Sequence, residues 1–231
     1  MPEFHSQYGQ DKMLHETIFK GFSGGIFVDV GANDGVSLNN TLFFEKDLGW
    51  TGLNVEPIPT VFEKLSKNRP KCINLNCAVS STDGSADFIM NSGYTEMLSG
   101  LALDFDRRHL ARLNFENSHN GGDTKIVPVQ TRRLDSIFRE NNITRVHYLS
   151  IDVEGGEFSV IKSIDFDAVK IDVIGFEDAY ADVGVPIVKF LEEKGYQKIG
   201  KTGDDIFMVH KASPFLPKDE GPRLLSYLKF K

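Results

Sequence analysis

Acidic side chains recur where buried strands of this sequence are expected to end. Carboxylates gathered at one place can hold the hydroxyls of a ribose, bind a hard divalent cation, or take a proton from a substrate. Because adjacent parallel strands present their C-terminal ends at one edge of a sheet, we expect these acids to face a common cleft. The set comprises Asp29, Glu56, Asp152, Glu154, Glu177 and Asp178.

A glycine-containing loop follows the first of these strands, where residues 26–36 read Ile-Phe-Val-Asp-Val-Gly-Ala-Asn-Asp-Gly-Val. Gly31 permits a tight turn and a close approach of a ligand to the backbone, and a helix start beyond it would offer free N–H groups. Asn33 and Val36 stand where the dinucleotide fingerprint needs its second and third glycines, and no Gly-Lys-Ser/Thr follows. The loop is therefore neither that fingerprint nor a P-loop.

Glu56 ends the second expected strand, Gly52–Val55. An acid at this point, roughly 20 residues after the glycines, is placed to accept both hydroxyls of a ribose. The loop and the acid in this order favour a cofactor that contains ribose.

Short apolar runs and stretches of helical spacing alternate along the chain. This alternation predicts an α/β fold with a mostly parallel sheet and helices on both faces. The turn Thr202-Gly203-Asp204 separates two further runs and predicts a closing hairpin, so we expect the sheet to end with an antiparallel strand. The expected strands are 25–30, 52–55, 72–78, 146–153, 171–176, 196–201 and 205–210, and the expected helices are 38–46, 60–67, 134–140, 158–164 and 186–194.

The stretch at about 87–130 breaks this alternation. It offers a strand at 86–90, a helix at 102–115, a polar loop at 117–123 and a strand at 125–129. Long insertions in α/β units are often lids or substrate loops, and a purely stabilising role is the alternative. We expect one domain over residues 5–211 that contains this insertion, followed by a C-terminal tail over 212–231 that either docks on the domain or contacts a partner or membrane surface.

Several motifs together resemble the FkbM family of S-adenosylmethionine-dependent methyltransferases. They cover most of the chain, and they are residues 6–11 (Ser-Gln-Tyr-Gly-Gln-Asp), 27–35, 54–57 (Asn-Val-Glu-Pro), 77–80 and 149–157. The resemblance implies a class I methyltransferase (Rossmann-like) fold, with a seven-stranded sheet that has one antiparallel strand. It also implies S-adenosylmethionine as cofactor and methylation of a hydroxyl on a sugar, glycan or related small molecule.

The resemblance also suggests where the cofactor binds. Gly31, Asn33 and Gly35 would admit its methionine end, with Asp29 orienting the loop or binding the amino group. Glu56 would take the ribose, and Ala78 and Val79 would lie against the adenine. Gln10, with Gln7, would close over the cofactor; the alternative is that this polar N-terminal arm is an ordinary surface feature. Asp152 would lie beside the methyl group of the cofactor.

Two mechanisms stay open for the later acids. In the first, Asp152, Glu177 and Asp178 bind Mg²⁺ or another divalent cation, which acidifies a substrate hydroxyl. In the second no metal binds, and a carboxylate such as Glu154 or a histidine acts as general base. The alternative to both is that these acids cap helices and solvate loops.

Three residues of the insertion are further candidates. His109 could reach over the active face as a catalytic residue, although Phe105 and Leu113 at helical spacing favour a packing role. Asn91 and Tyr94 follow the extra strand and are candidates for contact with the substrate.

Composition limits the remaining options. The chain has 231 residues with 26 Lys and Arg against 33 Asp and Glu, a formal charge of −7 that argues against nucleic acid as partner. No apolar run approaches the roughly 20 residues of a membrane span. Two cysteines, Cys72 and Cys77, cannot build a disulfide framework, which favours reduced thiols and a cytoplasmic location. An N-methyltransferase, a cofactor-binding module without turnover, and a homodimer remain among the hypotheses.

Overall fold

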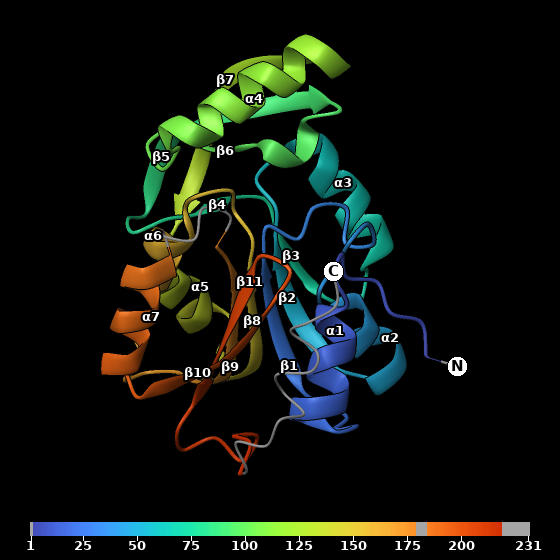
Figure 1. Cartoon of the computed structure of the whole chain (residues 1–231), viewed down its shortest axis with the longest axis vertical. Coiled ribbons are helices and arrows are strands. Elements are labelled where there is room, and N and C mark those ends of the chain that lie inside the picture. Colours follow the sequence, from blue (N-terminus) through green and yellow to red (C-terminus); the bar gives the residue numbers. More distant parts are fainter. Residues whose placement is uncertain (1, 179–183, 219–231) are drawn as a thin grey trace.

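The computed structural model describes residues 2–178 and 184–218, which form a main sheet, a smaller second sheet and flanking helices (Figure 1). The main sheet has seven strands in the order β10-β11-β9-β8-β1-β2-β3. Their bounds are β1 Ile26–Val30, β2 Thr51–Val55, β3 Ile73–Leu75, β8 Arg145–Ile151, β9 Lys170–Glu177, β10 Tyr196–Thr202 and β11 Asp205–His210.

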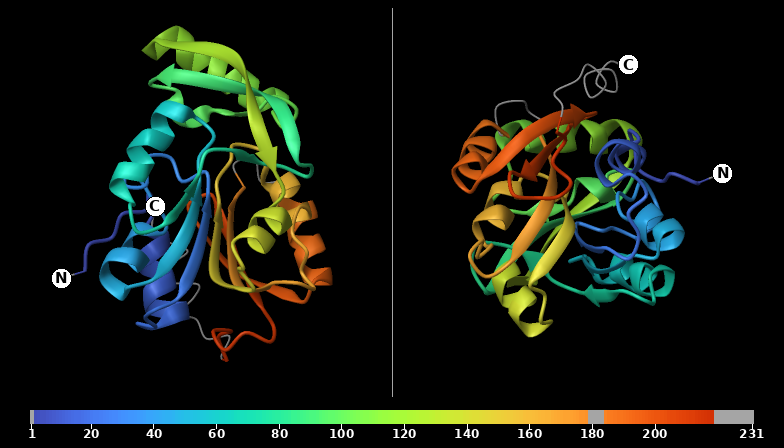
Figure 2. Two further views of the ribbon diagram at one scale, coloured as in Figure 1. Left: turned by 180° about the vertical axis from the view of Figure 1, so that it is seen from behind. Right: turned by 90° about the horizontal axis from the view of Figure 1, so that it is seen from below.

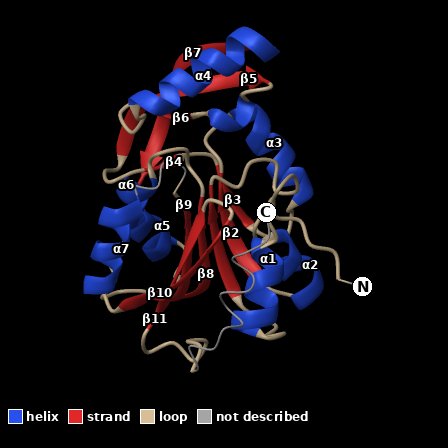
Figure 3. Ribbon diagram, viewed as in Figure 1, coloured by secondary structure: helices blue, strands red, loops and turns tan. Residues whose placement is uncertain are grey.

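Helices cover both faces of this sheet, as Figure 3 shows. Helices α1 (Gln10–Met13), α2 (Leu42–Leu48) and α3 (Pro59–Asn68), with a π-helical turn η1 (Leu14–Phe19), lie on one side. Helices α5 (Leu134–Glu140), α6 (Glu157–Lys162) and α7 (Gly184–Glu193) lie on the other. Each side encloses its own apolar cluster, because strand side chains alternate between the two faces. This confirms the predicted α/β class I methyltransferase-like fold.

The closing hairpin is present, but its antiparallel strand is not at the sheet edge. Strand β11 pairs antiparallel with both β9 and β10, so it lies between them. Strand β10 is therefore the edge strand and runs in the same direction as the parallel strands. The expectation of one antiparallel strand in seven holds, and its expected place at the end of the sheet is corrected.

The expected strand 72–78 is divided between the two sheets. Strand β3 pairs with β2, whereas β4 (Ala78–Val79) pairs with β7 (Gly122–Arg132) of the second sheet. Between them Asn76 donates hydrogen bonds from Nδ2 to the carbonyls of Glu56 (2.8 Å) and Pro57 (3.0 Å). These side-chain bonds replace strand pairing at the point where the chain leaves the main sheet.

The insertion builds the second sheet, which lies above the C-terminal ends of the main strands (Figure 2). Its order is β4-β7-β5-β6, with β5 Gly84–Gly93, β6 Gly100–Leu101 and β7 Gly122–Arg132. A 3₁₀ turn η2 (Glu96–Leu98) and helix α4 (Arg107–Asn120) complete it. The expected loop 117–123 is wrong, since α4 runs through its first half and β7 begins at Gly122.

Other packing predictions can be checked directly. Trp50 is buried, and its Nε1–H donates to the carbonyl of Phe22 (2.9 Å), so it packs as predicted. Cys72 and Cys77 are both free thiols. Phe215 packs edge-on against Phe19, so the first part of the tail docks on the domain, whereas residues 219–231 lie outside the described residues. Within the described chain no helix has the length and apolar character needed to cross a membrane.

Candidate active site

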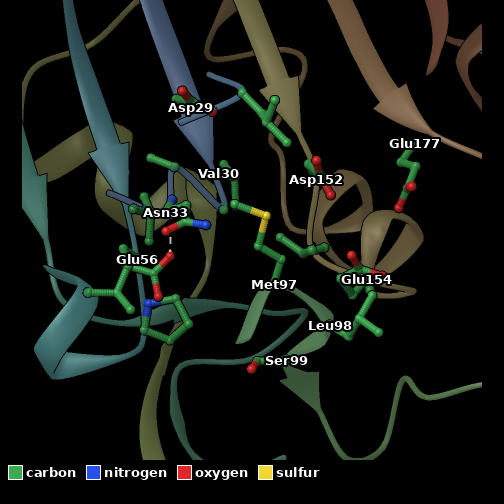
Figure 4. Close-up of a pocket in the computed structure, with 18 of the residues that line it drawn as sticks. Asp29, Val30, Asn33, Glu56, Met97, Leu98, Ser99, Asp152, Glu154 and Glu177 are labelled. Carbon is green, nitrogen blue, oxygen red and sulfur yellow. Dashed lines mark hydrogen bonds between the residues drawn. The ribbon is translucent and has the colours of Figure 1, made fainter. Parts of the chain in front are cut away.

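A cavity of about 260 Å³ lies where the strands of the main sheet end beneath the insertion (Figure 4). Residues at the ends of β1, β2, β8 and β9 line it, together with an N-terminal segment and parts of the insertion. The predicted residues that line it are Gln10, Asp29, Gly31, Asn33, Glu56, Ala78, Val79, Asp152, Glu154 and Glu177. These ten residues and Gln7, all chosen from sequence, therefore converge on one cavity.

Gly31 makes the turn at the end of β1. Its φ is +87°, and a Cβ placed there would lie 1.8 Å from the carbonyl oxygen of Asp152. The N–H groups of Gly31 and Ala32 both donate to the carbonyl of Val55, at 3.0 and 3.1 Å. The bare backbone at Gly31 thus allows the ends of β1, β2 and β8 to meet.

Glu56 is held in the cavity wall with 6% of its surface exposed. Its two carboxylate oxygens accept the N–H groups of Asn33 (3.1 Å, dashed in Figure 4) and Ile58 (2.8 Å). Burial raises the pKa of this carboxyl to about 7. Each oxygen retains a lone pair for a hydroxyl donor, which a ribose would supply.

Asp29 is committed to a buried network that supports the loop. Its carboxylate accepts from Asn39 Nδ2 (2.9 Å) and Thr41 Oγ1 (2.8 Å). Arg69, fully buried at the end of α3, donates to Asn39 Oδ1 and to the carbonyl of Gly35, both at 3.1 Å. Sequence reasoning missed Asn39, Thr41 and Arg69, because a polar residue before a helix and an arginine at a helix end are ordinary surface patterns.

Three carboxylates gather on the other side of the cavity (Figure 4). One side-chain oxygen each from Asp152, Glu154 and Glu177 lies within 4.8 Å of the other two. Burial raises the pKa of all three, and mutual repulsion raises those of Glu154 and Glu177 further. Three carboxyl groups this close are not all ionised together unless a cation compensates their charge.

Asp178 is not part of this cluster. Its Oδ1 accepts the N–H of Gly184 (2.9 Å), and its Oδ2 lies 3.7 Å from Lys201 Nζ. Successive residues of an extended chain point to opposite sides, so Glu177 and Asp178 diverge. Among the described residues, Glu154 thus takes the place in the cluster, beside Asp152 and Glu177, that was predicted for Asp178.

Gly35 also lies outside the cavity lining. Its φ is +76°, and a Cβ there would lie 2.6 Å from Leu65 Cδ1 and 2.7 Å from Arg69 Cγ. The absence of a side chain at Gly35 therefore allows the loop to pack closely against Leu65 and Arg69 of the region around α3.

The three candidates in the insertion do not line the cavity. His109 and Asn91 are buried, and both bind the carbonyl of Leu98, through Nε2 (3.2 Å) and Nδ2 (2.8 Å) respectively. Because that carbonyl can only accept, Nε2 of His109 carries its proton, and Nδ1 faces Glu154 Oε2 at 3.5 Å. Tyr94 is 68% exposed on the outer surface.

The insertion reaches the cavity through other residues. Met97, Leu98 and Ser99 line it, as Figure 4 shows, and His109 and Asn91 hold this segment through Leu98. Phe105 packs on His109 with ring centroids 4.4 Å apart, so the histidine is packed within the insertion and contacts the cluster through Glu154. No pattern in the sequence identified 97–99, since two apolar residues and a serine carry no chemical signal.

The strand order and the cavity define a class I methyltransferase-type α/β protein. Residues 29–198 match the family model described as Methyltransferase FkbM domain. The chain therefore belongs to the FkbM family of S-adenosylmethionine-dependent methyltransferases.

Two solved structures are similar to this chain. Methyltransferase FkbM from Methylobacillus flagellatus matches with a TM-score of 0.51 and 13% identity, over 81% of this chain and 44% of that chain. The present chain thus spans less than half the length of that protein. Aeropyrum pernix fibrillarin, solved with natively bound S-adenosyl-L-methionine, matches with a TM-score of 0.49 and 12% identity, over 88% of this chain and 74% of that chain. Comparison with curated proteins gives no match.

Proposed function

We propose that this chain transfers a methyl group from S-adenosylmethionine to a hydroxyl of a sugar, glycan or related small molecule. One observation carries the proposal. A single cavity holds a fixed carboxylate, Glu56, on one side and the cluster Asp152, Glu154 and Glu177 on the other. The first suits a ribose and the second suits activation of an acceptor hydroxyl.

The residues of the cavity fit the cofactor. S-adenosylmethionine supplies an electrophilic methyl group on a sulfonium sulfur when it is bound. Glu56 accepts the ribose hydroxyls, and the bare backbone at Gly31 leaves room beside it for the methionine end. Ala78 and Val79 offer apolar surface to the adenine. Asp29 acts as a support for the loop, since Asn39 and Thr41 already bind its carboxylate.

The carboxylate cluster would activate the acceptor hydroxyl. The acceptor oxygen forms a bond to the methyl carbon as the C–S bond breaks, the electron pair of that bond stays on sulfur, and the hydroxyl proton passes to a base. A sugar hydroxyl is weakly acidic, so its activation is the demanding part of the reaction. Holding this oxygen against the methyl group supplies a further part of the acceleration.

Two forms of activation fit the same three side chains. Asp152, Glu154 and Glu177 would hold a divalent cation such as Mg²⁺, whose hard oxygen ligands are carboxylates and hydroxyls. The cation would make the bound hydroxyl more acidic. Without it, one of these carboxylates takes the proton itself.

The proposal is tested with methyl-labelled S-adenosylmethionine and a panel of sugars, nucleotide sugars, glycans and amines, with products identified by mass spectrometry. We expect label on a hydroxyl oxygen. In calorimetry, Glu56→Ala should bind S-adenosylhomocysteine about 10- to 100-fold more weakly, because hydrogen bonds to a charged group contribute about 1.5–3 kcal/mol. Glu63→Ala, which removes an exposed acid on α3, serves as the matched control.

Three results would contradict the proposal in different ways. Unchanged affinity of a folded Glu56→Ala variant would remove the assigned cofactor site. Label found on amines alone would point to N-methylation. Cofactor binding with no transfer to any acceptor would point to a binding module without turnover.

A further inference from the structure

We propose that the N-terminal segment 7–10 and the β10–β11 turn form the acceptor subsite, with the ring of Tyr8 as a stacking platform for a neutral or aminated polyhydroxylated ring. The subsite discriminates against phosphorylated sugars. This inference rests on the proposed methyl transfer and assigns the residues that select its acceptor.

One wall of the cavity comes from outside the part of the chain that matches the family model. The N-terminal segment contributes Gln7, Tyr8 and Gln10 to this wall. The β10–β11 hairpin contributes Asp204 and Asp205. The family match covers residues 29–198 only. This wall therefore comes from the segments that flank residues 29–198.

The wall adjoins the carboxylate cluster. Asp205 of β11 pairs in register with Glu177 of β9. A molecule that places a hydroxyl beside Glu177 thus has its remaining atoms within reach of the wall. Glu56, on the proposed cofactor side, lies on the opposite side of the cavity from Glu177 (Figure 4).

The two segments of the wall are fixed to each other. Gln10, only 3% exposed, donates from Nε2 to Asp205 Oδ2 at 3.0 Å. Its Oε1 accepts the N–H of Tyr8 at 2.8 Å. Asp11 fastens the preceding residues, because its Oδ2 accepts the N–H groups of His5 (2.6 Å) and Ser6 (3.2 Å). The position of Tyr8 is therefore set before any ligand arrives.

The ring of Tyr8 rests on the hairpin turn. A Cβ at Gly203 would lie 2.1 Å from Tyr8 Cδ2, so the glycine is what lets the ring lie against the turn. Tyr8 nevertheless remains 50% exposed and lines the cavity. It offers a supported aromatic surface to a ligand at little cost in conformational entropy, since a Tyr side chain has few rotatable bonds.

The chemistry of the wall indicates what it binds. Carboxylates and amides accept and donate the hydrogen bonds of a polyhydroxylated ring, and an aromatic face packs against its C–H groups. Asp204 is exposed, and Asp152 and Glu177 line the same cavity. A phosphate beside the exposed carboxylate of Asp204 would meet like charge, whereas a hydroxyl or an ammonium would not.

Saturation-transfer NMR tests the subsite without requiring turnover. The probes are methyl β-D-glucopyranoside, its 2-amino analogue and glucose 6-phosphate, each with S-adenosylhomocysteine present. We expect saturation transfer to the first two and none to the phosphate ester. Tyr8→Ala should weaken glycoside binding about tenfold or more, since loss of an aromatic contact costs about 0.5–1.5 kcal/mol beyond the lost buried area. Tyr8→Phe should retain it.

Phe115→Ala is the matched control, because Phe115 is an exposed aromatic on α4 outside the cavity lining. Unchanged glycoside binding by Tyr8→Ala, stronger binding of the phosphate ester, or no transfer to any glycoside would each overturn the subsite. Calorimetry with S-adenosylhomocysteine separates this failure from that of the proposed function. If native protein binds S-adenosylhomocysteine but no glycoside, the cofactor site stands and only the acceptor subsite is overturned.

Discussion

Replacing Gly31 by alanine tests the geometry on which the whole site depends. The residue has φ +87°, and its added Cβ would lie 1.8 Å from the Asp152 carbonyl oxygen. A left-handed backbone costs an L-residue about 1–2 kcal/mol, and overpacking against backbone adds about 1–3 kcal/mol. We expect the free energy of unfolding of Gly31→Ala to fall by about 2–5 kcal/mol. Urea denaturation followed by circular dichroism measures this change.

Gly24→Ala provides the control at the other end of the same strand. Gly24 also has a left-handed φ, +68°, but nothing lies within 4 Å of the position of its Cβ. It should lose only the conformational part, about 1–2 kcal/mol. The difference between the two losses in free energy of unfolding measures the cost of placing a Cβ where the ends of β1 and β8 approach each other. Equal losses would refute the reasoning, and so would unchanged affinity of folded Gly31→Ala for S-adenosylhomocysteine.

Two further predictions concern the acids. Calorimetry should show binding of Mn²⁺ or Mg²⁺, and Glu177→Gln should weaken that binding at least tenfold. Glu193 is an exposed acid on α7, so Glu193→Gln should leave the affinity unchanged. Native protein that binds neither ion would eliminate the cation site. The folded pKa of Glu56, about 7, lies above its ordinary 4.5, so this carboxyl contributes stability that is fully present below pH 4.5 and lost as the pH rises through 7. Urea titrations between pH 5 and 8 should therefore show a smaller loss of stability in Glu56→Gln than in native protein, and identical slopes would contradict the assigned burial.

The strand ends could be predicted because their signals are local. A buried apolar run, a glycine with left-handed backbone and an acid at a fixed spacing placed Gly31 and Glu56 correctly in one cavity. The hairpin was readable from Gly203 in its turn. Its position in the sheet was not, since pairing of β11 with β9 is a long-range choice that the turn does not encode.

The remaining errors have physical causes of the same kind. Helix α4 was expected to stop before Asn117, but it continues to Asn120 and ends at Gly121, whose φ is +74°. Polar composition does not end a helix, whereas a glycine that adopts this conformation does. Asp178 was placed beside Asp152 from sequence order alone, and the direction of its side chain reversed that expectation.

The inner position of β11 has a consequence for biosynthesis. Strands β1 and β11 both contribute to the cavity, and Val30 and Asp205 are about 175 residues apart in the sequence. At a synthesis rate of about 5–20 residues per second, the ribosome needs about 9–35 s to pass from one to the other. The edge of β9 that β11 later covers has no partner strand from the time β9 is made until β11 follows, and the cofactor site is incomplete over the whole interval. Ligand binding can therefore stabilise the fold through the complete site only after β11 has been made.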